Sequence, residues 1–169
     1  MNILVTGVSG VGKTTLCDYL KQQGYIAFDM DDIPNLCKLY HSNGSPVKLN
    51  ENLVELNMLQ TDFLCDTKLL CDHIKNQKDL TFYLGYIDNF SEVAKLFDKI
   101  FLLTLSPEEN KHRMSIRTTT DLAKAEKTQD ELLQFKDNYE KIVIKHGAVT
   151  IDASSNTSVI AKHLLKELD

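Results

Sequence analysis

The chain has 169 residues, of which 43% are hydrophobic and 25% are charged, and its formal net charge at pH 7 is -5. These values are typical of a single globular domain and exclude a disordered or collagen-like chain. The acidic balance argues against a nucleic-acid-binding surface, and no apolar stretch approaches the roughly 20 residues of a membrane span. We therefore expect one soluble, cytoplasmic domain over residues 1–169.

The cysteines have no CxxC or Cys/His spacing typical of a zinc site, and nothing that resembles a secretion signal precedes the first apolar run. We expect them to be reduced thiols in a cytoplasmic protein. They are Cys17, Cys37, Cys65 and Cys71.

Short apolar runs alternate along the chain with segments of helical periodicity. The runs, which predict strands, are 2–5, 25–28, 80–84, 100–105 and 149–151. The helical segments follow the glycines up to Gly24 and then span about 50–76, 90–97, 107–117, 132–143 and 159–168, with a surface loop at 41–46 and a polar stretch at 118–130. This alternation predicts right-handed crossovers and a parallel sheet with helices on both faces, an α/β fold.

Residues 7–14, GVSGVGKT, follow the first predicted strand and open the first predicted helix. They match the phosphate-binding pattern G-x-x-x-x-G-K-[ST], in which backbone N–H groups surround phosphates, the lysine reaches the β- and γ-phosphates and the hydroxyl ligates Mg²⁺. The alternative, an ordinary strand-to-helix turn, requires a chance match that we place at roughly one in a hundred or less. The expected nucleotide-binding residues are Gly7, Val8, Ser9, Gly10, Val11, Gly12, Lys13, Thr14 and Thr15.

Two acids follow the second predicted strand, at Asp29 and Asp31. In an extended segment their side chains would point to the same side, at the sheet edge where ligands of α/β proteins bind. Such a carboxylate could hold Mg²⁺ or orient the hydroxyl of a phosphate acceptor and take its proton. Alternatively, Asp31 or Asp32 simply caps the next helix.

The glycine loop followed by FDMD resembles the P-loop small-molecule and nucleotide kinases, such as shikimate, gluconate and adenylate kinases, and above all the shikimate-kinase-like branch. The resemblance implies a three-layer P-loop NTPase fold, a five-stranded parallel sheet of order 2-3-1-4-5, and ATP and Mg²⁺ as cofactors. It also implies that Asp29 serves the metal, with Thr14, and that Asp31 holds the acceptor hydroxyl. The acceptor-binding segment would span about 30–76 and a lid about 118–130.

The chain departs from that branch after the third predicted strand. It has only Gly85 where the branch has a Gly-Gly-Gly turn, and it lacks the arginines that bind the acceptor there. Shikimate is therefore not the expected acceptor, although Gly85 could still bring backbone close to the substrate. Asp88 is a further candidate on the metal side, with helix capping as the alternative.

The chain contains only two arginines, Arg113 and Arg117, four residues apart in one predicted helix. A guanidinium binds phosphate oxygens in pairs and stacks on adenine, which lysine does poorly. In the resembling kinases this helix leads into the lid, and the loop after the last strand wraps the adenine. By that resemblance Arg113 and Arg117 would contact nucleotide, together with Asp152, Ala153, Ser154 and Ser155. The alternative is a pair of surface arginines bound to Glu108 or Glu109.

These residues predict an ATP- and Mg²⁺-dependent phosphotransferase with a small acceptor that carries a hydroxyl or phosphate group. Lys13, Asp31 and Arg117 would be its catalytic residues. Two alternatives remain: a regulatory ATPase or switch that acts through a partner, and a kinase of polynucleotide 5′ ends. The acidic charge balance disfavours the polynucleotide kinase. The chain also lacks an apolar run ending in Asp-Glu and an N-K-x-D motif, which argues against the regulatory ATPase or switch.

Overall fold

The computed structural model describes residues 1–47, 61–116 and 126–168, without the side chains of 126–133. The parallel sheet contains β1 (Asn2–Thr6), β2 (Ile26–Asp29), β5 (Thr81–Leu84), β6 (Lys99–Thr104) and β7 (Val149–Asp152). Its order is β2-β5-β1-β6-β7. Counted among these five strands alone, that is 2-3-1-4-5, so both the five strands and their order are confirmed.

The three central strands are apolar because both faces of the sheet are covered, as is usual for parallel sheets. Their central side chains have no solvent exposure and form the middle of the hydrophobic core. These are Ile3, Leu4 and Val5 on β1, Phe82, Tyr83 and Leu84 on β5, and Phe101, Leu102 and Leu103 on β6.

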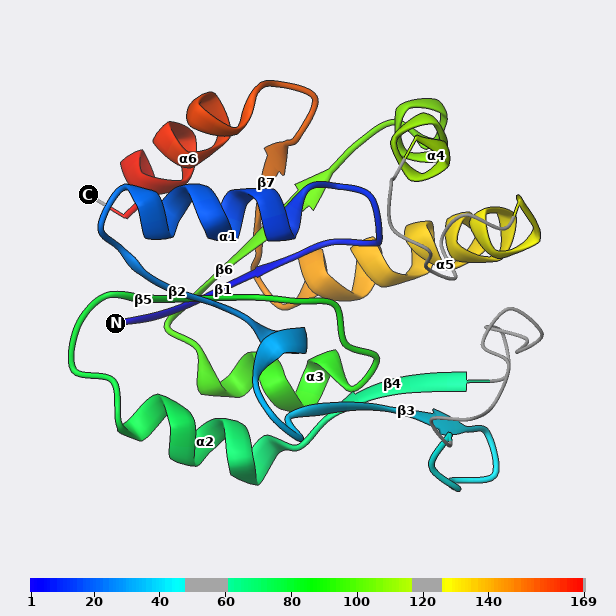
Figure 1. Cartoon of the computed structure of the whole chain (residues 1–169), viewed down its shortest axis with the longest axis horizontal. Coiled ribbons are helices and arrows are strands. Elements are labelled where there is room, and N and C mark those ends of the chain that lie inside the picture. Colours follow the sequence, from blue (N-terminus) through cyan, green and yellow to red (C-terminus); the bar gives the residue numbers. More distant parts are fainter. Residues whose placement is uncertain (48–60, 117–125, 169) are drawn as a thin grey trace.

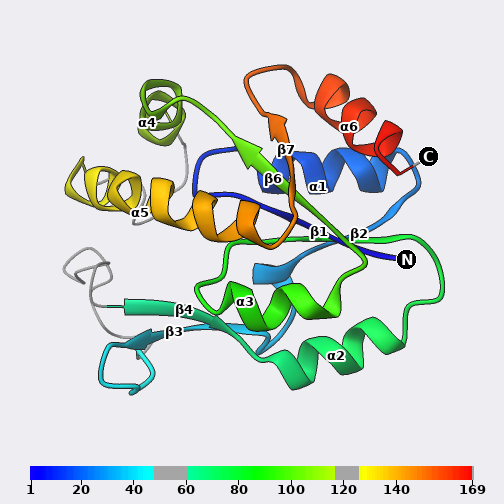
Figure 2. The same ribbon diagram turned by 180° about the vertical axis from the view of Figure 1, so that it is seen from behind.

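Helices cover both faces of this sheet, giving three layers (Figures 1 and 2). The helices are α1 (Lys13–Gln22), α2 (Thr67–Lys75), α3 (Phe90–Val93), α4 (Pro107–Ser115), α5 (Glu126–Lys145) and α6 (Thr157–Lys166). α1 and α6 lie on one face, whereas α2, α3 and α5 lie on the other (Figure 1). Because all five strands of the sheet are parallel, the glycine loop and the segments after β2, β5, β6 and β7 meet at one edge.

The long helix predicted over 50–76 is wrong at residues 61–65 and confirmed at 67–75, where α2 forms. Residues 61–65 form β4 (Thr61–Cys65), which pairs antiparallel with β3 (Cys37–His41) in a separate two-stranded sheet. Asp66 then starts α2, because its side chain accepts hydrogen bonds from the N–H groups of Lys68 and Leu69. The apolar spacing fits a helix, but the pairing with β3 decides for a strand; residues 50–60 of the prediction lie outside the described residues.

The predicted loop at 41–46 is confirmed as the turn that follows β3, closed by the bond from the N–H of His41 to the carbonyl of Ser45 at 2.8 Å. α5 begins at Glu126, earlier than the predicted helix at 132, so the end of the polar stretch 118–130 is helical. The rest of that stretch lies outside the described residues. No helix in the described part of the chain is long and apolar enough to cross a bilayer.

None of the cysteines forms a disulfide. Cys37 and Cys65 lie opposite each other in the register of β3 and β4. Burial raises the pKa of the Cys17 thiol to about 11, so this side chain is an inert core residue at neutral pH.

Candidate functional site

The glycine loop joins the carboxyl end of β1 to the first residue of α1, as the sequence pattern requires. Gly12 is the N-terminal cap of α1 and has φ +99°, a left-handed conformation that residues other than glycine rarely adopt. A Cβ atom added at Gly12 would meet no protein atom within 4 Å. The backbone therefore borders open space at the start of α1, where the helix dipole favours an anion.

Lys13, the first residue of α1, folds back over the loop. Its Nζ donates hydrogen bonds to the carbonyls of Gly7 at 2.7 Å and Val8 at 3.1 Å. The ammonium group is thus held beside the open space of the loop. Together with the helix N-terminus, it supplies the positive charge that a phosphate-binding loop requires.

Thr14 and Asp29, the two predicted metal-side residues, are in direct contact. The Thr14 hydroxyl donates to Oδ2 of Asp29 at 2.8 Å, although the two residues come from α1 and the end of β2. Asp29 is only 7% exposed, and a carboxylate so buried requires such partners. Hydroxyl and carboxylate oxygens are suitable Mg²⁺ ligands, so this pair fits a magnesium ion beside the phosphate site.

A closed protein cage for a metal is absent from the described part of the chain, which holds no cluster of three or more His, Cys, Asp or Glu side chains suited to one.

Asp31 is not in an extended segment, so the expectation that Asp29 and Asp31 point to the same side of a strand is wrong. β2 ends at Asp29, and Met30–Asp32 forms a short 3₁₀ helix. The capping alternative is also wrong in its choice of residue, because Asp29, rather than Asp31 or Asp32, caps this turn by accepting a bond from the N–H of Asp31 at 3.2 Å. The cap keeps the two carboxyl groups close together.

The surroundings of Asp31 favour its protonated form. Desolvation raises the pKa of this carboxyl above its usual value, and the neighbouring Asp29 carboxylate raises it further, against a smaller opposing effect of Lys13. Asp31 is nonetheless exposed. A solvent-accessible carboxylate with a raised pKa is a better proton acceptor than an ordinary aspartate.

Gly85 lies at the same sheet edge, immediately after β5. Its carbonyl accepts a hydrogen bond from the Thr6 hydroxyl at 2.7 Å, and a Cβ atom at this position would lie 2.9 Å from Cβ of Met30. Packing against Met30 therefore explains the glycine. Its contact with substrate stays a prediction.

Asp88 links the segment after β5 to the separate hairpin. Its Oδ2 accepts the N–H of Phe63 on β4 at 2.6 Å, and its Oδ1 accepts the Tyr86 hydroxyl. The cap position of α3 is Asn89, so Asp88 does not cap that helix. These contacts give Asp88 a role in holding β4 in place.

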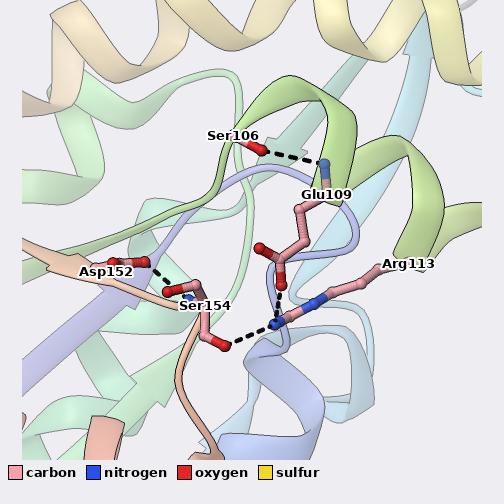
Figure 3. A network of polar contacts seen from close by, with 5 residues as sticks. All are labelled: Ser106, Glu109, Arg113, Asp152 and Ser154. Atoms are coloured by element: carbon pink, nitrogen blue, oxygen red, sulfur yellow. Dashed lines mark hydrogen bonds and ion pairs between the residues drawn. The ribbon is translucent and has the colours of Figure 1, made fainter.

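Arg113 connects α4 to the loop after β7 (Figure 3). Its guanidinium forms an ion pair with Glu109 at 2.6 Å, which is one of the alternatives drawn from the sequence, and it also donates to the carbonyl of Ser154 at 3.4 Å. The ion pair is partly exposed and contributes little to stability. The structure thus brings Arg113 to the predicted adenine loop, while Arg117 lies outside the described residues.

The loop after β7 is shaped by its own side chains. Oδ1 of Asp152 accepts the N–H of Ser154 at 2.8 Å, and this bond lowers the pKa of the Asp152 carboxyl (Figure 3). Ala153 is fully buried and donates its N–H to the carbonyl of Thr104 at 2.9 Å, whereas Ser155 is exposed. The backbone is therefore fixed beside Arg113, as a contact surface for a flat ring would require.

Sequence reasoning missed Asn110, a residue of α4 that contacts the glycine loop. Its side chain is fully buried and donates from Nδ2 to the carbonyl of Ser9 at 2.7 Å. In the sequence Asn110 stands within PEENKH, a polar segment typical of an exposed helix face. No local pattern could have revealed this contact, since the partner is 101 residues away.

Comparisons with known proteins agree with this fold. The family model described as "AAA domain" matches residues 3–134. No curated protein sequence matches the chain at a significant level.

Several solved kinase structures have the same fold. Shikimate kinase from Acinetobacter baumannii, in complex with shikimate, has a TM-score of 0.64 at 15% identity, covering 99% of this chain and 92% of that one. Deoxyadenosine kinase from M. mycoides with bound dATP has a TM-score of 0.55 at 15% identity, covering 99% of both chains. A gluconokinase from Sinorhizobium meliloti 1021 has a TM-score of 0.52 at 15% identity, covering 95% of this chain and 87% of that one.

Proposed function

The chain belongs to the AAA-domain family, and from this membership we propose that it is an ATP- and Mg²⁺-dependent phosphotransferase. It transfers the γ-phosphoryl group to a small acceptor that carries a hydroxyl or phosphate group. The observation that carries this proposal is the contact between Thr14 and Asp29, at 2.8 Å, beside the glycine loop and Lys13. The Thr14 and Asp29 oxygen atoms thereby lie next to the glycine loop, which supports a phosphate cradle with a Mg²⁺ site beside it.

The loop N–H groups and Lys13 would bind the β- and γ-phosphates of ATP. For this, the Lys13 ammonium group exchanges its bonds to the carbonyls of Gly7 and Val8 for phosphate oxygens. Thr14 and Asp29 would hold Mg²⁺, which supplies charge neutralisation for the phosphates when bound. Transfer then depends on positioning and electrostatic stabilisation.

Asp31 would accept the hydrogen bond and the proton of the acceptor hydroxyl. Its raised pKa suits this role, because a carboxylate that binds protons more tightly is a stronger base. Arg113 and the loop from Asp152 to Ser155 would bind the adenosine part of ATP. Arg117 would stabilise charge on the transferred group.

The structural neighbours are a shikimate kinase, a gluconokinase and a deoxyadenosine kinase. These kinases resemble the chain about equally in fold but differ in their acceptors. The comparison therefore supports a small-molecule acceptor and does not choose among sugar acids, cyclic acids and nucleosides. An acceptor screen should therefore span nucleosides, nucleoside monophosphates, sugars and hydroxylated acids.

The screen would measure ADP release with ATP and Mg²⁺, with the phosphorylated product identified by mass spectrometry. We expect product with one acceptor class, and a loss of about a hundredfold or more in kcat/KM for Lys13→Ala, since Lys13 is a preorganised cation at the phosphates. Lys75→Ala is the matched control, because Lys75 is an exposed lysine of α2 whose ion pair with Asp72 is also exposed. ATP binding without phosphorylated product from any class would refute the proposal.

A further inference from the structure

α4 packs directly against the tip of the glycine loop through Asn110. The Asn110 side chain has no solvent exposure, and its Nδ2 donates to the carbonyl of Ser9 at 2.7 Å. Because a carbonyl oxygen can only accept, the amide must present its NH₂ group to Ser9. The orientation of the amide is therefore set by this one bond.

Gly10 is a glycine of the loop that the G-x-x-x-x-G-K-[ST] pattern does not require, and the same packing explains it. A Cβ atom at Gly10 would lie 2.5 Å from Nδ2 of Asn110 and 2.9 Å from Cγ of Met114. Only a residue without a side chain lets the loop approach α4 this closely. Each segment thus carries a residue that this contact requires, Asn110 on α4 and Gly10 in the loop.

The bond from Asn110 also fixes the peptide unit between Ser9 and Gly10. No peptide bond of the described chain is cis, and in a planar trans peptide the C=O and the following N–H point in opposite directions. Since the carbonyl of Ser9 points toward Asn110, the N–H of Gly10 points away from α4. The peptide N–H is thereby directed to the side of the loop that α4 does not cover.

We propose that Asn110 is a positioning residue: by holding the carbonyl of Ser9, it presents the N–H of Gly10 to the phosphates of the bound nucleotide. This inference rests on the proposed function, because it requires a nucleotide in the loop. Asn110 itself does not touch the phosphates. It acts through the orientation of one peptide unit.

Stability does not account for an amide at this position. Oδ1 of Asn110 is buried and has no hydrogen-bond partner among the described residues. An unsatisfied buried acceptor destabilises the folded state, and an apolar side chain of the same size would avoid that loss. The amide is therefore better explained by what it does to the loop.

Asn110→Leu tests the proposal, because leucine has the same number of side-chain heavy atoms in the same branched arrangement and removes both the donor and the unsatisfied oxygen. The expected result is a Kd for ATP, measured by calorimetry, about tenfold to a hundredfold weaker than that of the wild type, which corresponds to one hydrogen bond to a charged group. The melting temperature should stay close to that of the wild type, because removal of the unsatisfied oxygen offsets the lost bond to Ser9. A purely structural residue would show the reverse, a lower melting temperature with unchanged Kd.

Asn89→Leu is the matched control. Its amide also binds backbone, with Nδ2 donating to the carbonyl of Cys65 at 2.9 Å and Oδ1 accepting the N–H of Cys65 at 3.0 Å. Both of its side-chain atoms are satisfied, so the same substitution should lower the melting temperature and leave the Kd for ATP unchanged.

Asn110→Asp provides a second, pH-dependent measurement. A protonated carboxyl can donate to the carbonyl of Ser9, whereas the ionised form cannot and repels it. The ratio of the variant and wild-type Kd values for ATP should therefore be near one at acidic pH and rise as the pH increases. A ratio independent of pH would contradict the proposed role of the donor.

In the wild type, the amide signal of Gly10 in ¹⁵N NMR spectra should shift on titration with ADP and with tripolyphosphate, and this shift should be reduced in Asn110→Leu. If wild type and Asn110→Leu bind ATP equally tightly, the inference is overturned while the proposed function stands. If the folded wild type binds neither ATP nor tripolyphosphate, the proposed function is refuted and the inference with it.

Discussion

The packing of the glycine loop against α4 can be tested by stability alone, without any ligand, through Gly10→Ala. Gly10 has φ +89°, and a Cβ atom would lie 2.5 Å from Nδ2 of Asn110. The left-handed conformation costs a side chain about 1–2 kcal/mol, and forcing an extra methyl group into packed surroundings costs about 1–3 kcal/mol more. We therefore expect Gly10→Ala to lower the free energy of unfolding by about 2–5 kcal/mol.

Gly24→Ala separates the two contributions. Gly24 has φ +85°, nearly the same conformation, but a Cβ atom there would meet nothing within 4 Å. Both substitutions reduce the entropy of the unfolded chain equally, so their difference isolates the steric contact with α4, about 1–3 kcal/mol. For a chain of this size that difference corresponds to about 2–12 °C in melting temperature.

The assay is urea denaturation followed by circular dichroism, with thermal melting as a second measurement. Shortening Asn110 in the double variant Gly10→Ala, Asn110→Ala should recover part of the loss, because the nearest atom is removed while Met114 remains. Equal destabilisation by Gly10→Ala and Gly24→Ala would refute the reasoning, since it would mean that α4 does not press on the loop.

Three further predictions concern the site and its support. Tyr139→Phe removes a buried hydroxyl that must donate to the Thr6 hydroxyl at 2.5 Å, because Thr6 donates its own proton to the carbonyl of Gly85. Thermal melting should show a loss of about 1 kcal/mol in stability. An unchanged melting temperature would contradict this bond. Asp31→Asn should raise the melting temperature at pH 7 while lowering kcat. The raised pKa of Asp31 means that the folded state favours the protonated carboxyl, so the ionised carboxylate destabilises the fold at neutral pH. In the wild type this destabilisation disappears as the pH falls through the raised pKa. A lower melting temperature at pH 7 would reverse that sign. Asp29→Asn should raise the Mg²⁺ concentration needed for half-maximal activity about tenfold or more, because Asp29 contacts Thr14 where the ion would bind. The measurement is a Mg²⁺ titration of activity. An unchanged Mg²⁺ requirement would place the metal elsewhere.

The sequence predicted the elements whose causes lie within a few neighbouring residues. The three central strands of the parallel sheet are apolar runs because both faces are buried, and that property is visible in the chain itself. The glycine loop is equally local, since its curvature and its junction with α1 depend on Gly12 and Lys13. The resemblance to P-loop kinases supplied the strand order, which no local pattern contains.

The separate hairpin shows where local reasoning ends. Residues 61–65 carry apolar side chains at a spacing compatible with a helix, and only β3, more than twenty residues earlier in the chain, makes them a strand. The acids after β2 give the same lesson at smaller scale. Asp29 turns its carboxylate to Thr14 and to the N–H of Asp31, and the chain leaves the extended conformation after Asp29, two residues earlier than alternation through Asp31 predicts.

By itself the sequence determined the fold class, the position of the glycine loop and the residue types available at the sheet edge. The tertiary structure alone decided which of them meet: Thr14 with Asp29, Arg113 with Ser154, and Asn110 with Ser9. The physical reason is that periodicity and turn chemistry act between near neighbours along the chain. A hydrogen bond between residues 101 positions apart is set by how α4 packs against the loop, and a single polar contact of this kind leaves no periodic trace in the sequence.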